Sequence, residues 1–117
     1  MTTTNTITTH VLDTMLGQPA RGIFVVLEHL EGNGAATPVG SGTTDNDGRI
    51  ADLLFQGGVL DQGTYRLRFA TGPYFAAARR DTFYPEVTIQ FVVRSGAQHY
   101  HVPLLLSPFG YTTYRGS

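Results

Sequence analysis

Hydrophobic and polar positions alternate along most of this chain with a period of two residues. The clearest example is "HYHVPLLL", from His99 to Leu106. Alternate side chains of an extended strand point to the same face. The two faces predicted here are Tyr100, Val102, Leu104 and Leu106 toward a core, and His99, His101, Pro103 and Leu105 on the opposite side. Two imidazoles therefore share a face with proline and leucine.

The same period recurs along the chain and predicts an all-β protein. The predicted strands are Ile7–Met15, Ile23–Leu30, Val39–Thr44, Arg49–Phe55, Thr64–Ala70, Glu86–Val93, His99–Leu106 and a last strand over residues 110–116. The sequence "DNDG", Asp45–Gly48, is typical of a hairpin turn, which makes Arg49–Phe55 a strand that returns along Val39–Thr44. Strands at this spacing favour a β-sandwich.

Two positions depart from the alternating pattern. The alanine-rich stretch from Pro73 to Arg80 predicts one short helix, because proline is tolerated in a first helical turn. Pro103 lies inside a run that otherwise resembles a central strand. Proline has no N–H for a ladder, so we expect either an edge strand or an unpaired amide at that point.

Composition narrows the class of protein. The 117 residues, 41% of them hydrophobic, suit a single domain over residues 1–117. A net charge of −1 and a pI near 6.4 argue against a nucleic-acid partner. The absence of cysteine excludes disulfides, thiolate zinc sites and a thiol nucleophile. There is no membrane-length apolar run and no signal-peptide pattern at the start, so a cytoplasmic protein is expected.

The histidines are the first candidates for chemistry. His29 stands beside acidic residues in its predicted strand and is interpreted as an ordinary surface position. His10 shares a predicted face with Leu12. His99 and His101 together could begin a metal site, but no local third ligand completes it, so the sequence favours no metal.

Arg49 and the end of the chain are weaker candidates. Arg49 follows the predicted turn and, taken alone, is most simply a charge on a loop exit. The segment after the last predicted strand contains Tyr114 and Arg115, which suits a docked terminus rather than a frayed one. Spacing alone does not show that His10, Arg49 and His101 meet.

Four stretches of the chain resemble the transthyretin-like family, specifically its 5-hydroxyisourate hydrolase branch. They are "THVLD" (Thr9–Asp13), "TTDNDGR" (Thr43–Arg49), "FYPEV" (Phe83–Val87) and "HYHVPLLLSPFGYTTYRGS" (His99–Ser117). The resemblance extends from about Ile7 to Ser117, and the closing "YRGS" is its most specific part. The hormone-carrying transthyretins share the scaffold but lack that ending and the histidine and arginine positions.

The resemblance implies a fold and an assembly. The expected fold is an eight-stranded transthyretin-like (prealbumin-like) β-sandwich with one short helix. Four subunits are expected to form a homotetramer, a dimer of dimers, with a channel through it and the sites at the dimer–dimer interface. The His101–Pro103–Leu105 face would line that channel.

The resemblance also implies a reaction and its residues. The expected reaction opens the ring of a purine-derived substrate, 5-hydroxyisourate, to 2-oxo-4-hydroxy-4-carboxy-5-ureidoimidazoline, without metal or cofactor. His10, Arg49, His101 and Ser117 would be catalytic, and His10, Arg49, Tyr114, Arg115 and Gly116 would bind substrate. Histidines move protons near neutral pH and a guanidinium holds oxygen atoms in a forked geometry. Which imidazole is the base stays open, and Ser117 would hold the histidine pair.

The sequence is also compatible with two other functions. The first is a carrier of the transthyretin type, which binds a small ligand in the channel without catalysis. The second is a structural sandwich domain without a site. The carrier would need a channel clear of bulky polar residues, whereas the structural domain predicts that His10, Arg49 and His101 are scattered.

Overall fold

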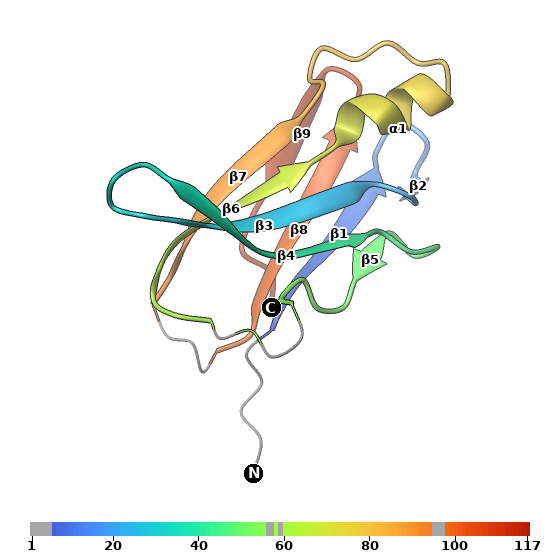
Figure 1. Ribbon diagram of the computed structural model, residues 1–117. Coiled ribbons are helices and arrows are strands. Elements are labelled where there is room, and N and C mark those ends of the chain that lie inside the picture. The colour runs from blue at the N-terminus through green and yellow to red at the C-terminus, as the bar shows by residue number, and fades with distance from the viewer. Residues whose placement is uncertain (1–5, 56–57, 59, 95–97) are drawn as a thin grey trace.

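The computed structural model of this chain describes residues 6–55, 58, 60–94 and 98–117, and it contains two β-sheets packed face to face (Figure 1). In chain order the elements are β1 (Ile7–Asp13), β2 (Gln18–Pro19), β3 (Phe24–Leu30), β4 (Ala36–Thr43), β5 (Arg49–Ile50), β6 (Gly63–Phe69), α1 (Thr71–Ala77), β7 (Val87–Val93), β8 (Tyr100–Ser107) and β9 (Gly110–Thr113). One sheet has the order β2-β1-β8-β9 with β5 also on β1, and the other has the order β4-β3-β6-β7. The predicted sandwich with one short helix is confirmed. Only the two-residue β2 has no counterpart among the predicted strands.

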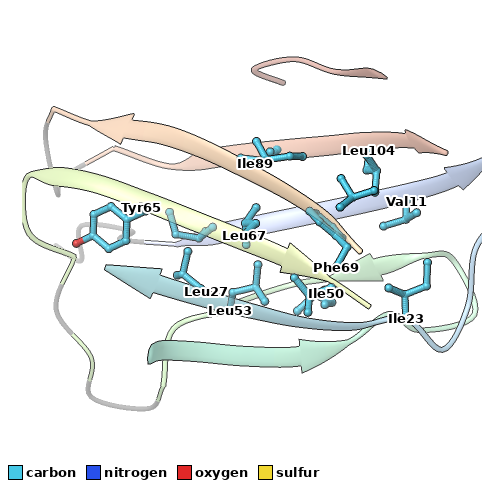
Figure 2. Packing of buried hydrophobic residues seen from close by; sticks show 14 of the residues in the cluster. Val11, Ile23, Leu27, Ile50, Leu53, Tyr65, Leu67, Phe69, Ile89 and Leu104 are labelled. Carbon is cyan, nitrogen blue, oxygen red and sulfur yellow. The ribbon is translucent and has the colours of Figure 1, made fainter. Parts of the chain in front are cut away.

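The alternation of side chains sets which face of each sheet is buried. In β8, Tyr100, Val102, Leu104 and Leu106 are all at most 6% exposed, as predicted. In β1 the buried positions are Ile7, Thr9, Val11 and Asp13, so His10 lies on the outward face. Figure 2 shows side chains of both sheets meeting between the layers, among them Leu104 from one sheet and Leu67 and Phe69 from the other. The outward face of the β1–β8 pair is therefore free to carry polar groups.

Strands β1 and β8 are parallel neighbours, although they lie at opposite ends of the sequence. Their register runs from Ile7 opposite Tyr100 to Asp13 opposite Leu106. Every other named strand pair in the described residues is antiparallel. The parallel pair places the start of the first strand beside His101 of β8 and beside His99, which precedes β8.

The predicted hairpin around Asp45–Gly48 is wrong in its pairing, although the turn exists. The Gly48 N–H donates to the Asp45 carbonyl at 2.9 Å, but β4 pairs with β3 while β5 pairs with β1. Only Arg49 and Ile50 of the predicted returning strand are in a strand of more than one residue. The chain crosses here from one sheet to the other, and the Val11 N–H donates to the Gly48 carbonyl at 2.7 Å. A Cβ at Gly48 would lie 2.4 Å from the Val11 carbonyl oxygen, so only glycine allows this approach.

Helix α1 begins two residues before the predicted start and ends at Ala77 rather than Arg80. Arg79 has a φ of 55°, which stops the helical path. Arg80 turns back instead to the inward-facing Asp13, with which it forms an ion pair. The Tyr74 hydroxyl of the helix donates to the same carboxylate at 2.7 Å. These contacts hold the helix against the Asp13 end of β1, away from the N- and C-termini of the chain (Figure 1).

Pro103 occupies a central strand rather than an edge strand, because β8 lies between β1 and β9. The β8–β9 ladder ends with Leu104 opposite Thr113, and pairing resumes at a single bridge between His101 and Gly116. Pro103 lies between these two pairings and so has no ladder partner on its β9 side, which fits the second expectation, although on its other side it is opposite His10 of β1. The proline therefore separates the ladder from the segment that follows it.

No helix in the described part of the chain has the length and apolar character needed to cross a membrane.

Candidate active site

Arg49 lies opposite His10 because the two are register partners in the antiparallel β1–β5 pair. Directly opposed residues in such a pair project from the same face of the sheet. The crossing at Gly48 is what brings Arg49 to this position, since β5 would otherwise continue beside β4. The structure thus joins two of the residues whose meeting the sequence could not establish.

His101 reaches the same outward face through the parallel β1–β8 pair. His101 is opposite Thr8, and Pro103 is opposite His10. The Thr8 hydroxyl lies 2.7 Å from His101 Nδ1. That hydrogen bond leaves Nε2 as the nitrogen available to water or substrate.

The segment after β9 turns back onto β8. The Gly116 N–H donates to the His101 carbonyl at 2.8 Å. A Cβ at Gly116 would lie 2.5 Å from His101 Cδ2, so the close approach of chain and ring requires glycine. This bridge places Ser117 beside His101, and the chain end lies near the start of β1 in Figure 1.

These residues surround a hollow of about 400 Å³, which we call the polar hollow. Its lining is Thr8, Thr9, Asp45, Arg49, Ile50, Ala51, His99, His101 and Ser117. Three of the four predicted catalytic residues line it together. His10, the fourth, is not among the lining residues but is the strand partner of Arg49.

Tyr114 and Arg115 line a different hollow, of about 320 Å³, between β7 and the start of β8. His101 lines this second hollow as well. Arg115 donates to Gln98 Oε1 at 3.0 Å, and its guanidinium carbon lies 4.9 Å from the centre of the Tyr100 ring. Within one chain the structure therefore does not bring Tyr114 and Arg115 together with Arg49 and Ser117, and their contact with substrate remains a prediction.

The polar hollow is rich in positive or protonatable groups. Burial, followed by the nearby Arg49, His99 and His10, lowers the pKa of His101 below its ordinary value. Asp45 is the acidic residue in the lining. The backbone N–H of Arg49, with further help from that of Asp47, lowers the pKa of Asp45. A neutral His101 at neutral pH is able to accept a proton.

Thr8 and Asp45 are site residues that the sequence reasoning missed. Thr8 has the same parity as His10 in β1, so the period-two pattern already placed it on the outward face. Asp45 accepts the backbone N–H groups of Asp47 and Arg49 at 2.9 and 3.0 Å, as is common for an aspartate that begins a turn. Both signals are local, but neither shows which strand will lie opposite.

The remaining histidines have different surroundings. His99 lies beside His101 with the two rings nearly parallel, 11° apart, and with centres separated by 6.5 Å. His29 lies in β3 of the other sheet, where its Nδ1 is 2.8 Å from Glu31 Oε2. Among the residues that the structure describes, no group of three or more histidine or acidic side chains is placed to hold a metal ion.

Known proteins resemble this chain along nearly its whole length. Residues 7–116 match the family model described as HIUase/Transthyretin family. A "5-hydroxyisourate hydrolase" of Salmonella typhimurium is 47% identical over 113 residues, which cover 97% of this chain and 82% of that protein. The structure of Klebsiella pneumoniae 5-hydroxyisourate hydrolase matches with a TM-score of 0.82 and 38% identity, over 96% of this chain and 99% of that one.

A carrier-type structure matches just as well in shape. Sea bream transthyretin in complex with thyroxine gives a TM-score of 0.86 over 94% of this chain and 93% of that one, but only 30% identity. The backbone therefore does not separate the hydrolase from the thyroxine-bound transthyretin within this fold. The length and identity of these matches nevertheless fix the family itself, and the chain belongs to the HIUase/Transthyretin family.

Proposed function

We propose that this protein is a hydrolase that opens the ring of 5-hydroxyisourate to 2-oxo-4-hydroxy-4-carboxy-5-ureidoimidazoline in urate degradation. The observation that supports it most is the convergence of Arg49, His101 and Ser117 on one hollow, with His10 paired to Arg49. The identity to curated hydrolases, 47% against 30% for the carrier-type structure, supports the same choice.

The residue types suit water attack on a ring carbonyl. An imidazole, that of His101 or that of His10, takes a proton from water as the oxygen attacks carbon. The Arg49 guanidinium holds substrate oxygen atoms and stabilises the charge that develops on the carbonyl oxygen. Ser117 orients the imidazole pair from the other side. The scheme uses side chains alone.

A homotetramer, built as a dimer of dimers, is part of the proposal. Strands β7 and β9 each end the order of a sheet, so pairing with a second copy would extend both sheets and cover two open edges. The half-buried Leu12 and Leu105 share the outward face with the site, which favours a covered face around the polar hollow. Sedimentation at micromolar concentration tests this, and a monodisperse monomer would contradict it. A cytoplasmic location stays a prediction from the sequence.

The decisive experiment is a decay assay. Urate oxidase generates 5-hydroxyisourate in the cuvette, and its loss is followed with and without this protein. Catalysed loss that disappears in Arg49→Ala and persists in His29→Ala supports the proposal. If the wild-type protein leaves the spontaneous decay unchanged, the hydrolase proposal fails and ligand binding without turnover becomes the alternative to test.

A further inference from the structure

On the outward face of the β1–β8 pair, two threonine hydroxyls alternate with two histidine rings in a row of four side chains. Thr6 precedes β1 and Thr8 lies within it, while His99 precedes β8 and His101 lies within it. The Thr6 hydroxyl is hydrogen-bonded to His99 Nδ1. The Thr8 hydroxyl lies 3.4 Å from His99 Nε2 and 2.7 Å from His101 Nδ1. Thr8 is therefore a hydroxyl bridge between two imidazoles.

The two ends of this row differ in their surroundings. His101, at one end, is half-buried, whereas His99, next to Thr6 at the other end, is exposed, and both imidazoles line the polar hollow. The row thus connects the reacting region to solvent through groups that each have a donor and an acceptor. The proposed scheme gives no role to Thr6, Thr8 or His99.

We propose that Thr6, His99 and Thr8 form a proton relay that exchanges protons between His101 and solvent during turnover. This inference rests on the proposed hydrolysis, because that reaction creates the need for the relay. Water brings two protons to the ring carbonyl. The first is taken up by His101 Nε2 and later passes to the leaving nitrogen of the ureido group, and the second leaves the product carboxyl group directly to solvent, because that group is ionised at neutral pH. The row releases one proton to solvent when Nε2 takes up the first proton and regains one when Nε2 gives it up, so the His101 ring stays neutral throughout.

The proton movements balance along the row. In the starting arrangement His101 Nδ1–H donates to Thr8, the Thr8 hydroxyl donates to His99 Nε2, and His99 Nδ1–H donates to Thr6. When His101 Nε2 takes a proton from water, each of these three hydrogens moves one step onward. Thr6 then releases its own hydroxyl proton to solvent. The row ends with every hydrogen bond reversed and with His101 carrying its proton on Nε2.

The reversed arrangement prepares the second proton transfer of the reaction, because His101 can now donate from Nε2 to the leaving nitrogen. The row returns to its starting direction as Thr6 regains a proton from solvent. The lowered pKa of His101 fits this exchange, because it disfavours a lasting imidazolium within the hollow. The 3.4 Å step between Thr8 and His99 is the longest in the row. Hydrogen bonds at active sites commonly shorten once substrate is bound.

Thr8→Val tests the relay, because valine keeps the branched shape and removes the hydroxyl. We expect kcat in weak buffer to fall about tenfold, with KM changed less than about twofold, since the change affects proton transfer and not binding. Added imidazole should restore most of kcat by delivering protons directly. Thr8→Ser should remain within about twofold of the wild type because it keeps the hydroxyl. Thr88→Val, an exposed threonine of β7, is the matched control.

A second measurement separates this inference from the proposed function. In ¹⁵N-histidine spectra without substrate, Thr8→Val should shift the Nδ1 signal of His101, whereas Thr88→Val should not. An unchanged signal overturns the relay whatever the activity. A wild-type protein that fails to hydrolyse 5-hydroxyisourate overturns the function first. An active protein whose Thr8→Val variant keeps full kcat in weak buffer, or loses activity that imidazole does not restore, overturns the relay alone.

Discussion

Strand β1 contributes to two polar clusters that differ in how their charges are balanced. On the inward face Asp13 is fully buried between the Arg80 guanidinium and the Tyr74 hydroxyl. On the outward face, three residues earlier, His10 is the strand partner of Arg49, which lines a hollow where positive or protonatable groups outnumber the acidic ones. The first cluster matches opposite charges, whereas the second holds more protonatable groups than acidic ones.

The pKa directions express the same contrast. Burial raises the pKa of Asp13, but hydrogen bonds from Arg80 and Tyr74 outweigh it and hold the pKa below its ordinary value. Burial and the hydrogen bond to Asp13 raise the pKa of Tyr74 to about 12. Both groups are thereby locked in one protonation state near neutral pH. His101, in contrast, remains neutral and able to accept a proton, so we infer that one cluster serves stability and the other serves chemistry.

The largest expected effect is on stability, from Arg80→Met. Methionine keeps much of the volume but removes the charge, which leaves a buried carboxylate with the Tyr74 hydroxyl and a backbone N–H. Removing one partner of a buried ion pair costs about 3–5 kcal/mol. Urea unfolding measures the loss, while the activity of the folded fraction should be unchanged. Arg79→Met, at the exposed neighbouring position, should cost less than about 0.5 kcal/mol.

Substitutions in the polar hollow should instead lower activity and leave stability nearly unchanged. Arg49→Ala and His101→Ala should each lower turnover by about a hundredfold or more, the usual range for losing charge stabilisation or acid–base catalysis. Their melting temperatures should stay near that of the wild type, because neither side chain lies in the core. Arg49→Lys should also lose most activity, since an ammonium lacks the forked contact. Normal turnover in Arg49→Ala would place the site elsewhere.

Gly116→Ala should lower activity by less than the loss of Arg49 or His101. The new Cβ would lie 2.5 Å from His101 Cδ2 and 3.2 Å from Pro103 Cγ, so the ring or the chain end must move. We expect kcat/KM to fall about tenfold while the free energy of unfolding changes by less than about 1 kcal/mol. Gly32→Ala, at a position with open space around it, is the control. A silent Gly116→Ala would show that the chain end does not position His101.

The smallest effect concerns acid stability. Asp13 has a lower pKa in the folded chain than its ordinary value of 3.8, so the stability it provides is present above that value. That contribution is lost as the pH falls through the still lower folded pKa. As the pH falls below 3.8, the wild type should therefore lose free energy of unfolding, in urea titrations, more steeply than Arg80→Met. Equal slopes would mean that Arg80 does not set the Asp13 pKa.

The sequence predicted the elements well because their signals are local. The alternation from Tyr100 to Leu106 reports burial directly, and the alanine-rich stretch after Pro73 reports a helix. The turn at Asp45–Gly48 was also recognisable. The predicted pairing of the two strands on either side of it is wrong, because "DNDG" indicates the shape of the turn but not the partner of the strand that follows the turn.

The site was only partly predictable for the same reason. His10, Arg49 and His101 were named through the family resemblance, and the proximity of Arg49 and His10 depends on β5 joining β1 instead of β4. Thr8 acquires significance only when β8 lies beside it, a pairing between residues far apart in the sequence. Tyr114 and Ser117 are three residues apart in the chain but line different hollows, which no period in the sequence indicates.

The parallel pairing of β1 with β8 also has a consequence for biosynthesis. Thr8 and His101 are 93 residues apart in the chain, so β1 is made long before β8. Until β8 is made, the edge of β1 that faces it is unpaired, and its backbone groups are open to other chains. Folding that depends on such distant pairing is slow. The strand on which Thr8 and His10 lie is thus also a segment of the nascent chain that needs protection from aggregation.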